Sequence, residues 1–140
     1  MAMSDTCYET LGDLSGSFMH YIDWGYDDKD LSLVVDSMYS LAKFGILQDN
    51  LNRPTDAWLA ETTHKVVITG LLEDMEMDNV EGACVRIASI AKHNVTLAEG
   101  IEYLAKGLQH KSSLFDMITE PLLHQRLEKI VTYCSMQCVG

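Results

Sequence analysis

Apolar residues recur at helical spacing from one end of this chain of 140 residues to the other. In the clearest segment, which follows Asp30, small or apolar residues return every three or four positions on one face: Leu31, Val34, Val35, Met38, Leu41, Ala42 and Gly45. Almost no stretch alternates with period two, and β-branched residues are not concentrated in runs. The pattern therefore predicts helices throughout and no sheet.

Breaks in this pattern divide the chain into helices. Gly25 interrupts the first stripe and predicts a turn over 24–28, and a second break over 49–54 ends in Pro54. An acidic run over 73–78 and the short segment 93–95 end the third and fourth stripes. A brief helical turn is expected over 114–118, and a final helix is expected to follow Pro121. Short connections without strands predict an all-α, single compact bundle of five to seven helices, with residues 1–140 as one domain.

Two helix starts carry recognisable capping residues. Asp78 or Asn79 is expected to cap the fourth helix. The fifth helix is expected to begin with the capping box formed by Thr96 and Glu99, in which each side chain bonds a backbone amide of the first turn.

Composition places the chain among cytoplasmic proteins. It is 47% hydrophobic and 22% charged, which is ordinary for a globular domain. No apolar run reaches the roughly 18 residues that a membrane span needs, and the start of the chain is acidic where a secretory signal is basic. The four cysteines form no dense disulfide framework, which favours a reducing compartment, although an even number leaves paired bridges as an alternative.

The cysteines and histidines do not form a pattern typical of a metal site. Cys134 and Cys138 are four residues apart but fall on the apolar stripe of the last helix, where cysteine packs as a small hydrophobe. Glu61 and His64 form one Glu-x-x-His unit, whereas di-iron bundles need two such units and two further carboxylates. We therefore expect no metal and no cofactor, and we interpret His64 as a core histidine with a hydrogen-bond partner.

No motif in the sequence identifies a reaction. It has no nucleophile elbow, no zinc-protease motif and no glycine-rich phosphate loop, so we expect no catalytic residues and no enzyme activity. Phosphorelay is a weaker alternative, because His64 and His110 each precede a lysine without the spacing typical of that class. The segment 86–108 resembles a helix-turn-helix only in outline. Its second helix is acidic, so direct binding to nucleic acid is not expected.

The charge of the chain is strongly negative and unevenly placed. The net charge is −11, with nine acidic and two basic residues in 1–50, eight and four in 51–100, and four of each in 101–140. Such a field attracts basic surfaces and repels nucleic acid and anionic membranes. The charge therefore indicates a protein partner with a basic surface.

The expected turn over 24–28 is the best candidate for the contact surface, because it combines two aromatic residues with acids on both sides. Trp and Tyr often carry most of the binding energy of an interface. The candidate partner-binding residues are Asp23, Trp24, Tyr26, Asp27, Asp28 and Asp30. In the alternative interpretation, Trp24 and Tyr26 fold back and close the end of the bundle.

These observations favour a non-catalytic acidic binding protein that blocks a basic surface of a nucleic-acid-handling partner. Nucleic-acid mimics and phage or plasmid anti-defence inhibitors work in this way, since carboxylates can occupy sites prepared for phosphates. An immunity protein or antitoxin that neutralises a cognate toxin would share the same charge pattern. A metal-binding or phosphorelay bundle and a generic regulatory bundle are further alternatives.

Overall fold

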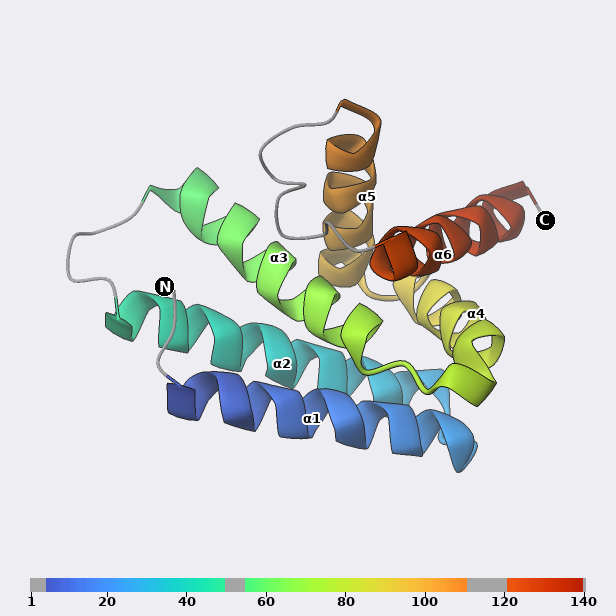
Figure 1. Cartoon of the computed structure of the whole chain (residues 1–140), viewed down its shortest axis with the longest axis horizontal. Coiled ribbons are helices and arrows are strands. Elements are labelled where there is room, and N and C mark those ends of the chain that lie inside the picture. The colour runs from blue at the N-terminus through green and yellow to red at the C-terminus, as the bar shows by residue number, and fades with distance from the viewer. Residues whose placement is uncertain (1–4, 50–54, 111–120, 140) are drawn as a thin grey trace.

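The computed structural model describes residues 5–49, 55–110 and 121–139, and over these ranges it confirms the predicted all-α bundle. The described residues form six α-helices and one 3-10 turn, with no strand (Figure 1). The elements are α1 (Asp5–Asp23), α2 (Asp28–Asp49), α3 (Asp56–Glu73), η1 (Met77–Asn79), α4 (Val80–Ala91), α5 (Val95–His110) and α6 (Pro121–Val139). The expected features at Pro54 and over 114–118 lie outside the described residues.

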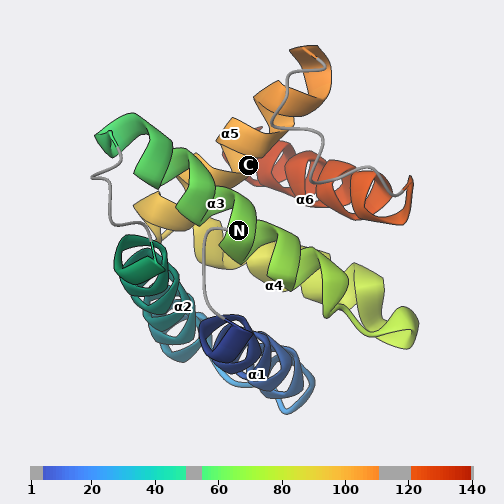
Figure 2. The ribbon, with the colours of Figure 1, turned by 60° about the vertical axis from the view of Figure 1, so that its left-hand side comes forward.

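The helices pack around α3 and α4. Helices α1 and α2 lie side by side and antiparallel, joined by a tight turn, and α3 crosses them (Figure 1). On the other side of α3, helix α6 packs along α4, and α5 stands between α3 and α6 (Figure 2). No helix among the described residues is both long enough and apolar enough to cross a membrane.

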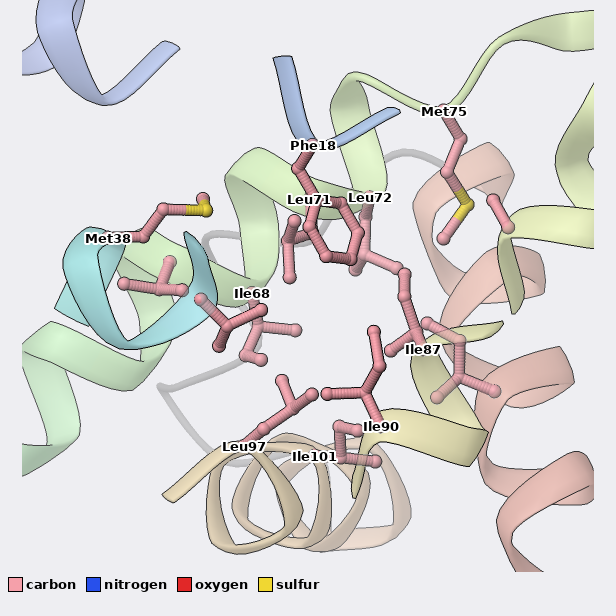
Figure 3. Packing of buried hydrophobic residues seen from close by; sticks show 14 of the residues in the cluster. Phe18, Met38, Ile68, Leu71, Leu72, Met75, Ile87, Ile90, Leu97 and Ile101 are labelled. Carbon is pink, nitrogen blue, oxygen red and sulfur yellow. The ribbon is translucent and has the colours of Figure 1, made fainter. Parts of the chain in front are cut away.

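One cluster of buried side chains receives residues from all six helices. Figure 3 shows how Phe18, Met38, Ile68, Ile87 and Leu97 converge from α1 to α5. Each large apolar side chain buried in this way contributes about 1.5–3 kcal/mol relative to an exposed one. The predicted stripes supply most of the cluster, which explains why helical periodicity alone predicts the fold class. Ala60 is an exception, because its spacing along α3 places it on the same apolar stripe as Val67 and Leu71, which are buried, but it is exposed.

The capping residues differ from the predicted ones at α5. Asn94, rather than Thr96, caps this helix: its Oδ1 accepts a hydrogen bond from the Leu97 amide at 3.1 Å. The buried Asn94 also donates through Nδ2 to Ser32 Oγ at 2.8 Å and to Asp36 Oδ1 at 3.0 Å on α2. The capping-box prediction was therefore wrong, because a tertiary contact with α2 starts the helix two residues earlier.

Two polar groups in the core also have structural explanations. The buried Arg126 of α6 donates through Nη1 to the Leu72 carbonyl at 2.5 Å, near the end of α3, where carbonyl groups lack helical partners. Burial raises the pKa of the Cys84 thiol to about 11, so it packs as a neutral group. Cys134 packs partly buried against the core, as its stripe predicts, and the side chain of Cys138 lies outside the described residues.

Candidate functional site

The predicted turn between α1 and α2 is present and brings its aromatic residues together. Gly25 adopts a φ of 79°, a left-handed conformation that disfavours a residue with a Cβ. The chain then reverses, and the Tyr26 amide donates back to the Tyr21 carbonyl at 3.0 Å. Asp27 Oδ1 accepts from the Asp30 amide at 2.9 Å and so caps α2.

Four rings cluster at this turn. Tyr21 and Tyr26 stack with centroids 4.7 Å apart, and Trp24 lies 5.9 Å from Tyr21, 6.4 Å from Tyr26 and 6.1 Å from His20. Despite these contacts, Trp24 is 68% exposed and Tyr26 is 42% exposed. The exposure of Trp24 contradicts the interpretation in which it closes the end of the bundle, whereas Tyr26 stacks on Tyr21, which packs partly buried against the core.

The six candidate residues do not all remain available to a partner. Asp23, Trp24, Tyr26, Asp27 and Asp30 are exposed. Asp28, in contrast, accepts from Arg86 Nε at 3.1 Å and also bonds the Ser89 hydroxyl. Arg86 donates in addition to the Tyr26 carbonyl. Asp28 therefore fastens the turn to α4, and its role in the structure is internal.

A second acidic segment lies against the first. The connection from α3 to α4 meets the end of α1, because Asn79 Nδ2 donates to Asp23 Oδ1 at 2.6 Å and Glu76 Oε1 lies 3.9 Å from His20 Nδ1. Asn79 is the N-cap residue of α4, as predicted, but its side chain bonds Asp23 and makes no capping hydrogen bond. Next to Glu76, Met77 is 82% exposed.

We call this end of the bundle the acidic corner. Both connections lie at the lower right of Figure 1. The negative charge of Asp23 raises the pKa of Glu76, and a hydrogen bond between the two carboxyl groups raises it further. The acidic corner therefore combines exposed aromatic and apolar side chains with carboxylates. Its exposed residues are His20, Asp23, Trp24, Tyr26, Asp27, Asp30, Glu76, Met77 and Asp78.

The sequence reading missed Glu76, Met77 and Asp78 as members of this surface. Their acidic run was visible, but it was interpreted only as the end of a helix. About fifty residues separate it from the α1–α2 turn along the chain. No local pattern indicates which connections of a bundle lie at the same end, so the helix packing was needed to place them together.

A separate cleft of about 500 Å³ opens between α2, α3 and the start of α5. On its wall, Tyr39 Oη lies 3.0 Å from His64 Nδ1. Burial lowers the pKa of His64 and outweighs the opposing effect of Glu99, so the imidazole is neutral near pH 7. His64 thus has the hydrogen-bond partner that the sequence indicates, although it is half-buried beside a cleft.

The Glu-x-x-His unit does not assemble around His64. The Glu61 carboxylate pairs instead with Lys65, one helical turn further along, at 3.6 Å. Within the described ranges, no three His, Cys, Asp or Glu side chains lie close enough to hold a metal ion. The Tyr39–His64 pair thus joins α2 to α3, and the exposed surface with the most distinctive chemistry is the acidic corner.

Comparison of the chain with models of protein families, with curated proteins and with solved structures finds no match.

Proposed function

We propose that this is a non-catalytic cytoplasmic binding protein whose acidic corner attaches to a basic surface of a partner protein and blocks it. One observation carries the proposal. Two acidic connections, distant in the sequence, meet at one end of the bundle, and each carries an exposed aromatic or apolar side chain, Trp24 on one and Met77 on the other. An interface needs a desolvated anchor as well as charges, and the corner offers both.

The chemistry of the corner also suggests the class of partner. Basic surfaces inside cells belong mostly to proteins that handle nucleic acid, and the Arg and Lys donors that bind phosphates also bind carboxylates. A net charge of −11 steers such partners toward the protein and repels nucleic acid itself. A nuclease, including one that acts as a toxin, presents a surface of this kind.

Charge reversal at the corner tests the proposal. Asp30 and Asp78 are exposed members of the acidic corner, and the corner variant replaces both with lysine. The control variant replaces Glu9 and Asp13 with lysine. Both residues are exposed on α1, and at a helical rise of 1.5 Å per residue they lie roughly 15 Å or more from Asp23. Both variants change the net charge equally, so any difference between them reports position.

We expect the corner variant to associate at least about tenfold more slowly than the wild type at low salt, with a weaker salt dependence. The control variant should stay close to the wild type. The partner is first captured with the wild-type protein from cells of the source organism, and association rates are then measured by surface plasmon resonance over a salt series. Equal slowing by both variants would indicate a general charge effect, and no slowing by either would contradict the proposal.

A further inference from the structure

We propose that the acidic corner binds an arginine side chain of the partner, with the guanidinium stacked on Trp24 and paired with the carboxylates of Asp23 and Glu76. This inference rests on the proposed function, because it names the chemical group that the corner recognises. It follows from the combination of an exposed indole ring with the carboxylate of Asp23 at the end of α1 and that of Glu76 on the adjoining α3–α4 connection.

The indole of Trp24 is suited to bind a cation. Its neighbours His20, Tyr21 and Tyr26 have ring centroids between 5.9 and 6.4 Å away, while 68% of the residue stays exposed. The cluster therefore supports the ring from inside the turn and leaves indole surface open to a partner. A cation over the face of Trp gains about 0.5–1 kcal/mol at an exposed site and about 2 kcal/mol or more when water is excluded.

The adjacent carboxylates supply the opposite charge. Asp23 and Glu76 lie at the same end of the bundle, since Asn79 of the α3–α4 connection bonds Asp23 and Glu76 lies beside His20 of α1. The negative charge of Asp23 raises the pKa of Glu76, and a cation between the two carboxylates would relieve this repulsion. His20 lies 3.9 Å from Glu76 but adds a positive charge only when it is protonated. A guanidinium remains charged at all physiological pH values and has five donors, so it can pair with both carboxylates at once.

Arginine fits this arrangement better than lysine does. The planar guanidinium can stack on the indole and still direct its edge donors toward carboxylates, whereas an ammonium group is a compact, strongly hydrated charge. The same corner already holds one arginine internally: Arg86 pairs with Asp28 and donates to the Tyr26 carbonyl. Of the carboxylates that remain exposed, Asp23 adjoins Trp24 in the chain, and Glu76 lies beside His20, whose ring stacks on Trp24.

Asp23 and the turn that carries Trp24 are held in place before a partner arrives. The Asn79 amide fixes Asp23 at 2.6 Å, and the Arg86 contacts fasten the turn to α4. Because few side chains must be ordered on binding, less of the interaction energy is lost to entropy. The part of the corner that would contact the cationic side chain through Asp23 and Trp24 is therefore preformed.

The test uses short peptides as probes. The chain has two tryptophans, so Trp58→Phe makes Trp24 the only indole reporter. The acetylated and amidated peptides (Gly-Arg)4 and (Gly-Lys)4, which carry equal charge, are titrated against this protein by calorimetry and by indole fluorescence. We expect the arginine peptide to bind about 3–10-fold more tightly than the lysine peptide and to change the Trp24 emission.

Two variants separate the proposed contacts from general electrostatics. Trp24→Leu should bring the affinity of the arginine peptide to that of the lysine peptide, and Glu76→Gln should weaken arginine binding more than Glu9→Gln, a matched change on exposed α1. Thermal melting of each variant checks that the fold is retained, which we expect because all three side chains are exposed.

Equal affinities for the two peptides, no binding of either, or an arginine preference that survives Trp24→Leu would overturn the inference. Preference for an apolar peptide would do the same and would indicate that Trp24 and Met77 form an apolar anchor. Any of these results leaves the proposed function intact if charge reversal at Asp30 and Asp78 still slows association with the captured partner. The two hypotheses therefore fail separately.

Discussion

Gly100 shows how a single residue shapes the wall of the cleft. A Cβ at this position would lie 2.5 Å from Tyr39 Oη and 2.8 Å from His64 Nδ1, closer than either contact allows. Glycine inside a helix costs about 1 kcal/mol relative to alanine. At this point of α5 the cost is offset, because the missing side chain lets the Tyr39–His64 pair pack directly against the helix.

The lowered pKa of His64 predicts a loss of stability in mild acid. The pKa of an unfolded histidine is near 6.5, whereas the folded protein favours the neutral imidazole and so lowers the pKa of His64. The contribution of His64 to the free energy of unfolding is therefore complete above about pH 6.5 and is lost as the pH falls through the lowered pKa of the folded state. The groups around it are Tyr39 on α2 and Glu99 and Tyr103 on α5. The free energy of unfolding should therefore fall between pH 7.5 and 5, and it should fall less in His64→Gln.

Urea denaturation across this pH range measures the effect. His93→Gln is the matched control, because it removes a histidine that is exposed rather than half-buried beside the cleft. Parallel curves for the wild type and His64→Gln would show that the protonation state of His64 does not matter for folding.

At the scale of elements, the start of α5 depends on a contact between helices. Both Asn94 and Thr96 are plausible capping residues by type. Asn94 caps the helix because its side-chain amide also bonds Ser32 and Asp36 on α2, which places the residue in a buried position between two helices. Local capping preferences could not distinguish the two residues, since the deciding partners lie about sixty positions earlier in the chain.

We expect alanine substitutions at Asn94 and Thr96 to differ in how much they lower the free energy of unfolding. Asn94→Ala removes the cap and the interhelical bonds, and it should lower the free energy of unfolding by about 2 kcal/mol. Thr96→Ala changes an exposed residue within the first turn and should stay within about 0.5 kcal/mol of the wild type. Urea denaturation at pH 7.5 measures both changes in the free energy of unfolding. A larger loss for Thr96→Ala than for Asn94→Ala would show that Thr96 caps the helix after all.

At the scale of the whole molecule, the negative charge opposes folding while it favours a basic partner. A net charge of −11 makes the compact state repel itself, and the acidic corner concentrates that repulsion. Ion pairs such as Lys129–Glu81 and Lys106–Glu102 are exposed and offset little of it. The electrostatic repulsion is therefore greatest at the acidic corner, where we propose that the partner binds.

Salt should accordingly stabilise the free protein. Raising NaCl from 20 to 500 mM screens the repulsion, and a gain of about 1 kcal/mol corresponds to a rise in Tm of roughly 2–4 °C for a chain near this size. The variant with lysine at positions 30 and 78 should show a smaller rise and a higher Tm at low salt. Differential scanning calorimetry measures both, and a Tm that falls with salt would show that attractive pairs outweigh the repulsion.

The sequence by itself determined most of the described helices, most of the core and the turn that carries Trp24. Helix formation depends on the spacing of apolar residues, on Gly25 and on Pro121, and each of these acts over one or two turns of chain. Amphipathic stripes likewise indicate which face of a helix is buried, without information about the neighbouring helices.

Only the tertiary structure decided which distant residues meet. The pairs Asp23–Asn79, Asp28–Arg86 and Tyr39–His64 join residues between 25 and 58 positions apart. These pairs follow from how the helices cross as their apolar stripes pack, and no local pattern encodes that geometry. For this reason the sequence indicated Trp24 and its acidic neighbours, whereas the fold removed Asp28 from the exposed set and added Glu76, Met77 and Asp78.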